Sequence, residues 1–389
     1  MKKVNIFLTI LFLTAGCGGN RQADIENEGL ITVDVSRSYP QKELILQDFM
    51  DVEYIVLETD GEFYTQGVVQ TFGEDIVVVK NRLNDGDIFI FDKNGKGLRK
   101  FNRLGRGAEE YTFISWIALD EDNNEMFVSD NMTRRILVYD LDGKYKRSLK
   151  QMEGRGSYNG GFNFNNDYLI CYDNFSPNAD EEIRRNSFFI VYKHNGIIKE
   201  MEIPVKKKIS TVMNVQYDRP LAIGPPNCLL TPYQSNWILT EPSSDTVYIY
   251  MPDESMQPFI VRTPSVQSME PEIFLFPGVL TDRYYFLQTI KKEWDFERFT
   301  GLPSTDLLYD RQEKTIFKTV VYNGDYSNEK LVNMFQDSVN DKIAFWQKIE
   351  ADELVEDFKN GVLKGRLKEI AAGIEEESNP VIMLVKYKK

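Results

Sequence analysis

One pattern recurs three times along the chain at a nearly constant spacing. Four apolar residues ending in an aromatic residue are followed by a polar turn with glycine at the eighth place. The three copies are IFIFDKNGKGL (88–98), ILVYDLDGKYK (136–146) and FIVYKHNGIIK (189–199). Their glycines, Gly95, Gly143 and Gly196, are 48 and 53 residues apart. Each copy predicts a β-hairpin, because glycine supplies the left-handed backbone that a tight turn requires. A repeat of this length constrains the fold more strongly than any single motif.

Further strand patterns surround these hairpins. A strand is predicted before each of the three hairpins, at 75–80, 125–130 and 167–173. Three later, less regular units are predicted at 236–241 with 245–250, at 283–288 with 306–314, and at 341–346. The stretch 62–347 holds about six units of the repeat length. Segments such as IFIF and ILVY are apolar on both faces, which is typical of strands covered by neighbouring sheets on both sides. We therefore predict an all-β fold, a six-bladed β-propeller, rather than hairpins stacked in a two-domain β-sandwich.

The C-terminal region departs from this β pattern. Apolar residues recur at helical spacing across 349–376, which predicts a helix. Gly361 and Gly365 lie inside it and favour either close packing or a break into two shorter helices. The sequence VIMLVKY then returns to strand character, so residues 380–388 are predicted to lie beside an early strand and close the ring. A helix that binds a partner is the alternative interpretation of the apolar stripe.

The N-terminus, MKKVNIFLTILFLTAGC, has the layout of an export signal. Two lysines precede an apolar run that is too short to span a membrane. Its end, LTAGC (13–17), resembles the lipobox of bacterial lipoproteins, with Thr14 where leucine is commonest. The resemblance implies a signal peptide over residues 1–16 and a lipid attached to Cys17. The alternative is an ordinary secretory signal with a chance cysteine.

The remaining chain divides into a short tether and one domain. Residues 17–29 are polar and contain glycine, which predicts a flexible tether, and residues 30–389 are expected to form the single propeller domain. No later apolar run is long enough to cross a bilayer, so membrane contact is expected through the lipid anchor at Cys17. The residue after Cys17 is glycine and not aspartate. By resemblance to the lipoprotein sorting rule of enterobacteria, this indicates the outer membrane of the cell envelope.

Several segments together resemble a known family. They are DVEYIVLET (51–59), FDKNGKGLRKF (91–101), GRGAEEY (105–111), DTVYIY (245–250) and SNPVIMLVKYKK (378–389). In these segments the chain is similar to the six-bladed β-propeller lipoproteins of Bacteroidetes, which are related to NHL and TolB-type propellers and whose function is uncharacterised. The family usually carries Gly-x-Gly-Pro-Gly-Glu-Tyr where this chain has Ala108 and Glu109 in place of proline and glycine. The resemblance implies the fold, and it implies no particular ligand.

Composition excludes several classes of function. The chain has 46 Lys and Arg against 60 Asp and Glu, a formal charge of −14, so no nucleic-acid partner is expected. His194 is the single histidine and is expected in a solvated turn, which excludes a His-rich metal site. Cys171 and Cys228 are compatible with a disulfide or with two separate thiols. No cofactor is predicted, because no motif for one occurs, and no motif places a nucleophile beside its base.

Two loops supply the candidate ligand-binding residues. The insertion KKEWDFERFTG (291–301) brings aromatic and charged side chains together, and aromatic loop residues stack on sugars or anchor proteins. The alternative is a longer hairpin whose aromatic residues pack on the next blade. The loop around 105–111 carries charges that suit a polar ligand. The candidates are Trp294, Phe296, Arg298, Phe299, Arg103, Arg106 and Tyr111.

The acidic run DEDNNE (120–125) offers oxygen ligands at close spacing. It lacks the glycine and the final glutamate of an EF-hand loop, so we predict an ordinary turn and no metal site. Taken together, the features predict a membrane-anchored envelope lipoprotein whose propeller is a binding or scaffold module for a glycan, peptide or protein. The alternative is an envelope hydrolase or lyase that uses carboxylates around the channel, with or without calcium. No catalytic residue is identified.

Overall fold

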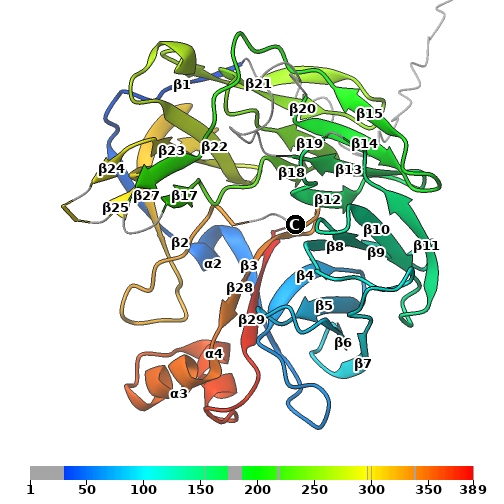
Figure 1. Ribbon diagram of the computed structural model, residues 1–389. Coiled ribbons are helices and arrows are strands. Elements are labelled where there is room, and N and C mark those ends of the chain that lie inside the picture. The colour runs from blue at the N-terminus through cyan, green and yellow to red at the C-terminus, as the bar shows by residue number, and fades with distance from the viewer. Residues whose placement is uncertain are drawn as a thin grey trace, which may run out of the picture.

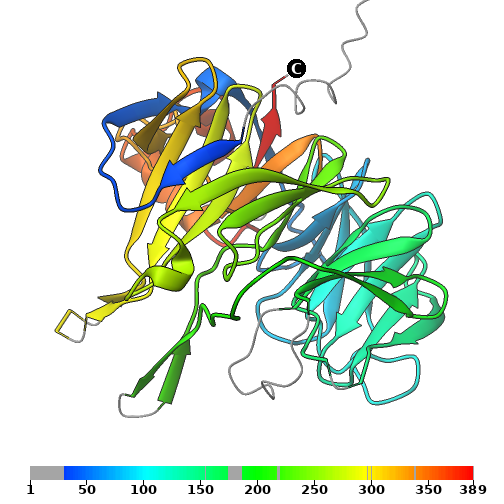
Figure 2. The same cartoon turned by 90° about the horizontal axis from the view of Figure 1, so that it is seen from above.

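The computed structural model describes residues 30–388 except 154, 174–185, 217–219, 296, 299 and 337–338. Within these residues, six sheets of three to five strands stand side by side in a ring (Figures 1 and 2). We number these blades 1 to 6 in chain order. The six-bladed β-propeller predicted from the repeat is thereby confirmed. The predicted signal peptide and tether, with Cys17, lie outside the described residues.

The blades take their strands mostly from consecutive segments. Blade 1 holds β4 (Val68–Phe72), β5 (Ile76–Lys80), β6 (Asp87–Asp92) and β7 (Gly97–Asn102); blade 2 holds β8 (Trp116–Asp120), β9 (Glu125–Asp130), β10 (Arg135–Tyr139) and β11 (Tyr145–Lys150). Blade 3 holds β12 (Gly160–Asn163), β13 (Tyr168–Tyr172), β14 (Phe188–Tyr192) and β15 (Ile198–Met201); blade 4 holds β18 (Leu230–Tyr233), β19 (Asn236–Leu239), β20 (Thr246–Tyr250) and β21 (Met256–Thr263). Blade 5 holds β22 (Ile273–Leu280), β23 (Tyr284–Lys291), β26 (Ser304–Asp310) and β27 (Thr315–Tyr322); blade 6 holds β28 (Ile343–Ile349), β29 (Val381–Tyr387) and β3 (Met50–Val56).

Burial explains why the central strands are apolar on both faces. Residues 88–91 of β6 and 136–139 of β10 are almost fully buried, as the sequence pattern predicted. The buried apolar side chains of the described residues form six clusters, each joining side chains of neighbouring blades. The ring is therefore held together mainly by apolar burial between blades, which is the dominant favourable term in folding.

The repeated glycine has a second role besides turn geometry. Gly95, Gly143 and Gly196 all have positive φ, at 89°, 79° and 73°. A Cβ atom on Gly95 would lie 2.0 Å from the carbonyl oxygen of Val56, at the end of the outer strand of the preceding blade. The turn of one blade thus packs directly on its neighbour, and a side chain at Gly95 would push the two apart.

The N-terminal residues 31–56, which we call the N-terminal belt, run along the outside of three blades. β1 (Ile31–Asp34) pairs in parallel with β21, and β2 (Gln41–Ile45) pairs in parallel with β27. A short helix, α2 (Leu46–Phe49), then leads into β3. Figure 1 shows this segment in blue, passing from blade 4 along blade 5 to blade 6. Neither β1 nor β2 was predicted from the sequence.

The ring is closed by the C-terminal strand. β29 lies between β28 and β3, with Val381 opposite Val56 and Tyr387 opposite Met50. The chain reaches β29 through two helices, α3 (Ala351–Lys359) and α4 (Gly365–Ala371). Gly361 and Gly365 both have positive φ, which ends one helix before the next begins. The predicted closing strand is confirmed, and the predicted helix is broken in two.

The apolar stripe of the two helices is covered by the protein itself. Leu354, Leu367 and Ile370 are buried in the cluster that joins blades 5 and 6. The alternative of a partner-binding helix is therefore wrong for this stripe. Among the described helices, none has the length and apolar character needed to cross a membrane.

Three smaller elements complete the described chain. The hairpin of β16 (Met213–Gln216) and β17 (Pro220–Ile223) lies between blades 3 and 4 in sequence, and a second hairpin, β24 (Trp294–Asp295) with β25 (Thr300–Gly301), extends blade 5. A single turn of 3₁₀-helix, η1, covers Val266–Ser268. Cys171 is a buried free thiol, and the Sγ atom of Cys228 donates to the carbonyl oxygen of Leu230 at 3.0 Å.

Candidate functional site

A cavity of about 820 Å³ lies at the centre of the ring. It is lined by β4, β8 and β12 of blades 1 to 3, by the β18–β19 hairpin of blade 4, and by residues 339–346 around the start of β28. Within the described chain, no residue of blade 5 lines it. Its volume is in the range of sites that enclose small organic ligands.

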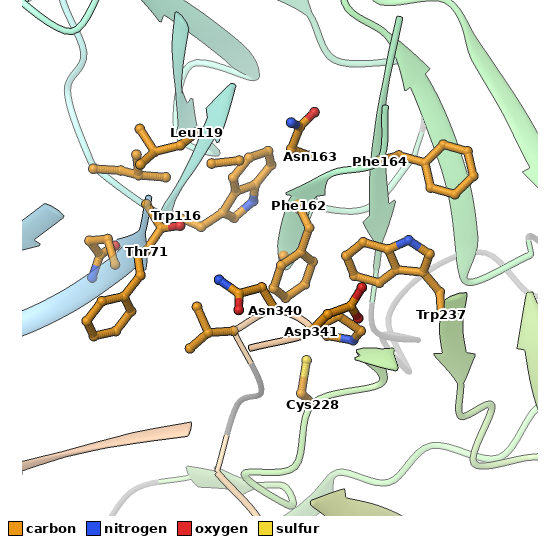
Figure 3. Close-up of a pocket in the computed structure, with 18 of the residues that line it drawn as sticks. Thr71, Trp116, Leu119, Phe162, Asn163, Phe164, Cys228, Trp237, Asn340 and Asp341 are labelled. Carbon is orange, nitrogen blue, oxygen red and sulfur yellow. The ribbon is translucent and has the colours of Figure 1, made fainter. Parts of the chain in front are cut away.

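Several aromatic side chains stand in the otherwise mixed wall of this cavity. The chain has four tryptophans, and three of them, Trp116, Trp237 and Trp346, line the cavity. Phe162 packs against Trp237 with ring centroids 5.2 Å apart and planes at 50°. Figure 3 shows Trp116, Phe162 and Trp237 pointing into the same space from three different elements. The cavity therefore presents several apolar ring surfaces to one ligand.

Trp116 is held rigidly in place. Its indole Nε1 donates a hydrogen bond to the carbonyl oxygen of Tyr158 at 2.8 Å. Its ring lies over Gly161, where a Cβ atom would come within 2.5 Å of the indole. Glycine at this point of β12 thus makes room for the ring. Because the ring is fixed before any ligand arrives, little conformational entropy is lost on binding.

Polar groups lie beside the aromatic residues at one mouth of the cavity. The Oδ1 atom of Asn340 accepts hydrogen bonds from the backbone N–H groups of Lys342 and Ile343, both at 2.9 Å. Its Nδ2 group has no partner among the described residues and is available to a ligand. The Oδ2 atom of Asp341 accepts from the backbone N–H and the hydroxyl of Ser235, at 2.8 and 2.9 Å. Both side chains are therefore oriented by the backbone around them.

The charged residues in the described lining are all acidic. The lining includes the carboxylates of Glu74, Glu121, Asp122 and Asp341 and, in the part of the chain described, no lysine or arginine. Glu121 accepts a hydrogen bond from the backbone N–H of Glu74 at 2.6 Å, which joins the turns of blades 1 and 2. Lys342 lies 3.7 Å from Glu74 in an exposed ion pair. The other three carboxylates have no ion pair among the described residues, so repulsion between like charges disfavours an anionic ligand here.

Two carboxylates of the acidic run 120–125 are paired with cations of the protein itself. Asp120 is buried and paired with the ammonium group of Lys193. At the other end of the run, Glu125 is held by Arg147 through two hydrogen bonds of 2.5 and 2.7 Å, and the pKa of its carboxyl is lowered against the raising effect of burial. No group of three potential metal ligands occurs in the described residues. Cations from other strands of the fold thus hold two carboxylates of this run.

The loop around 105–111 has a structural role that the sequence analysis did not anticipate. Tyr111 is buried and donates a hydrogen bond through its hydroxyl to the carbonyl oxygen of Gly86 at 2.6 Å, and burial raises the pKa of its hydroxyl. The guanidinium of Arg103 donates to the carbonyl oxygen of Gly143 in the next blade, twice at 3.2 Å. The prediction that Tyr111 binds a ligand is therefore wrong, because the side chain belongs to the core between blades 1 and 2. Arg106 is exposed on the same loop.

The other predicted loop forms the β24–β25 hairpin. The ring of Trp294 is half-buried and lies over Gly301, where a Cβ atom would be 2.1 Å from it. Arg298 is exposed and lies 3.8 Å from Asp295. Phe296 and Phe299 lie outside the described residues. This hairpin and the loop at 105–111 stand on different sides of the ring (Figures 1 and 2), and none of their described candidates lines the central cavity.

One signal in the sequence points to the cavity. Trp116, Trp237 and Trp346 each occur in an inner region of a different blade, within SWIALD, NWILTE and IAFWQK. Two of these segments were predicted as strands, but the direction of each tryptophan side chain was not considered. Recurrence of one large aromatic residue near the axis of a repeat fold indicates a shared central surface.

Comparisons with known proteins place this geometry in a family. No curated protein matches the chain. It is similar to the crystal structure of a protein of Bacteroides fragilis that has been assigned as exported, with 14% identity and a TM-score of 0.61, over 93% of this chain and 100% of that one. It is also similar to a member of the DUF4221 family from Bacteroides vulgatus, with 12% identity and a TM-score of 0.49, over 88% of this chain and 98% of that one. The first of these supports the propeller fold. The chain matches the family described as "Domain of unknown function (DUF4934)" over residues 30–386, and it therefore belongs to that family.

Proposed function

We propose that this protein binds a neutral glycan in its central cavity. The observation that carries the proposal is the wall of tryptophan and phenylalanine rings beside amide and carboxylate groups, with no cation in the described lining. Sugars present apolar C–H faces to aromatic rings and hydroxyl groups to amides and carboxylates, so one ligand satisfies both kinds of surface. Glycans with uronic acid, sulfate or phosphate are disfavoured by the four carboxylates.

Binding is favoured over catalysis by the state of the carboxylates. Glu121 and Asp341 both accept hydrogen bonds from backbone N–H groups at the mouth. These contacts fix both carboxylates as part of the wall. A glycosidase instead needs two carboxyl groups that face the scissile bond, one of them as the general acid. We therefore place the hydrolase or lyase hypothesis second.

The proposal predicts a contrast between two tryptophans. Replacement of Trp346, which lines the cavity, by alanine is expected to weaken capture of neutral oligosaccharides by roughly thirtyfold or more, because a buried aromatic contact is worth about 2 kcal/mol. Replacement of Trp294, also half-buried but outside the cavity, serves as the matched control and should leave binding unchanged. The measurement is binding to an array of neutral oligosaccharides and their uronate or sulfated counterparts, with circular dichroism as a check of folding.

The opposite pattern would locate the site elsewhere. Loss of binding in Trp294→Ala with retention in Trp346→Ala would return the site to the β24–β25 hairpin, as the sequence analysis predicted with Trp294 and Arg298. Equal binding of acidic and neutral glycans would overturn the argument from charge. Absence of binding to every glycan on the array would reject the glycan proposal itself.

We further propose that the protein is a lipid-anchored lipoprotein of the cell envelope, on the outer membrane. The export-signal pattern at residues 1–16 and the lipobox ending at Cys17 support this proposal. The similarity to a Bacteroides fragilis protein assigned as exported is consistent with a location outside the cytoplasm. A glycan-binding ring held at a membrane by a short tether would retain its ligand at that surface.

The anchor makes its own prediction. Cys17→Ala is expected to abolish incorporation of radiolabelled palmitate and to block cleavage at residue 16, because the acceptor thiol is lost. The measurement is labelling of cells followed by fractionation and gel mobility. Cys228→Ala, which removes a cysteine of the folded body, is the control and should label like the parent. A Cys17→Ala protein of mature size that still carries label would exclude this anchor.

A further inference from the structure

A second hollow opens beside the mouth of the central cavity. It has a volume of about 480 Å³ and lies between α2, the turn from β22 to β23 in blade 5, the turn from β18 to β19 in blade 4, and residues 387–388 at the end of β29. We call it the blade 5 groove. Blade 5 is the blade that contributes no described residue to the central cavity. The groove therefore uses the blade that the described lining of the central cavity does not.

The groove and the cavity are continuous through one residue. Asp341 lines both of them. On the cavity side it accepts hydrogen bonds from Ser235. On the groove side, Gln234 donates to Asp282 at 3.3 Å. Asp341 and the turn at 234–235, with Ser235 in the cavity and Gln234 in the groove, thus form the boundary between the two spaces. A chain-like ligand that leaves the cavity across this boundary enters the groove.

The floor of the groove is aromatic and rigid. Phe49 of α2 packs edge-on against Tyr284 with centroids 5.4 Å apart, and stacks on Phe286 at 5.7 Å. Tyr284 and Phe286, the two rings that contact Phe49, are buried. Phe49 itself is partly exposed at the groove. The floor therefore repeats the apolar ring surface that the tryptophans provide inside the cavity.

The polar rim of the groove differs from that of the cavity by containing cations. Arg283 donates to the buried carboxylate of Asp310 at 3.0 and 3.3 Å, which fixes its position. Lys388 donates to the backbone carbonyl oxygens of Gln47 and Asp48 at 2.7 and 3.1 Å. Asp282 and Asp341 also line the groove, so the rim offers both donors and acceptors beside an apolar floor. That combination suits the hydroxyl groups and C–H faces of further sugar units.

We propose that the blade 5 groove is a second subsite for the same glycan chain, so that this protein selects an oligosaccharide long enough to cross Asp341. The inference rests on the proposed function, because the first sugars occupy the central cavity. It adds a preference for chain length, which the cavity alone does not require. Binding at two connected subsites raises affinity because the second contact is made within one complex.

The test uses linear neutral oligosaccharides of glucose, xylose and mannose, from disaccharide to octasaccharide, measured by isothermal titration calorimetry on the full protein. Within the sugar series that binds, oligosaccharides long enough to reach the groove should bind about tenfold more tightly than those that only fill the cavity. Asp282→Trp, at an exposed turn position, should fill the groove and remove this rise while leaving the shortest binder unaffected. Lys388→Ala should reduce the rise. Asp142→Trp, the same change in an exposed turn of blade 2, is the matched control.

The outcomes separate this inference from the function on which it rests. An affinity that does not change with length, or a rise that persists in Asp282→Trp, would overturn the second subsite while cavity binding stands. Both proposals are supported if Trp346→Ala binds oligosaccharides of no length and Asp282→Trp loses only the additional affinity for long chains. Absence of binding at every length in every series would overturn the proposed function and this inference with it.

Discussion

Truncation of the chain after Pro380 is expected to leave no folded ring. The deletion removes β29, the strand that lies between β28 and β3 and joins the two ends of the chain. Residues 381–385 are at most 4% exposed. Burial of five such side chains contributes roughly 1.5–3 kcal/mol each, a sum comparable to the entire stability of a domain, about 5–15 kcal/mol. The measurements are soluble yield, circular dichroism and urea unfolding.

Two point variants test the same strand, one with a large expected effect and one as the control. Val385→Asp places a charge where the wild-type side chain is fully buried, and should also prevent folding. Lys386→Gln, one residue further along, loses a partly exposed ion pair with Glu53 and should change the free energy of unfolding by less than about 1 kcal/mol. A truncated protein that melts at the temperature of the full chain would show that the ring does not depend on this strand.

Lys193→Met is expected to lower the free energy of unfolding by about 3–5 kcal/mol. The ammonium group of Lys193 pairs with Asp120 of blade 2 and donates to the carbonyl oxygen of Asn165 at 2.5 Å, and the side chains of both charged residues are 2% exposed. Removal of the cation leaves the carboxylate of Asp120 buried without a countercharge, which is far more costly than loss of the pair as a whole. Urea unfolding followed by fluorescence measures the change.

A double variant distinguishes this explanation from simple loss of packing. Lys193→Met combined with Asp120→Asn removes both charges and should recover most of the lost stability. Lys199→Met, which breaks an ion pair with Glu254 on a side chain that is 65% exposed, is the surface control and should change stability by about 1 kcal/mol or less. If Lys193→Met costs no more than Lys199→Met, the buried pair does not stabilise the contact between blades 2 and 3.

The blades were predictable because their signals are local. In a hairpin such as 88–98 the strand residues and the glycine lie within a few positions of each other. The number of such repeats then gives the number of blades. β1 and β2 carry no comparable signal. They are strands because the outer edges of blades 4 and 5 offer unpaired backbone groups, and those edges exist only after the ring has formed. Because each of these strands pairs with a strand far away in the sequence, neither carries a local sequence pattern that predicts it.

The candidate site was harder to predict for a related reason. The direction of an aromatic side chain depends on the position of its strand in the ring, which a single sequence does not state. Trp116 faces the axis, Trp294 lies on an outer hairpin, and Tyr111 is buried between two blades. Trp116 and Trp294 each begin a strand and Tyr111 lies in the loop before β8, and the local sequence does not separate the three cases. The pairing of Asp120 with Lys193, 73 residues away, was likewise beyond reach, because it arises from contact between neighbouring blades.

The N-terminal belt has a consequence for the order in which the molecule assembles. Its three strands are synthesised first, yet Ile31, Gln41 and Val56 pair with Ile260, Lys318 and Val381, each more than 200 residues later. Contacts of such long range are slow to form, since the chain between them must be ordered first. Until β21 of blade 4 emerges, the belt has no partner, and the partial ring keeps open edges until β29 has been made. β3 and β29, from the two ends of the propeller domain, thus hold each other in place. A chain cut short before β29 lacks this pairing and is left open to proteolysis.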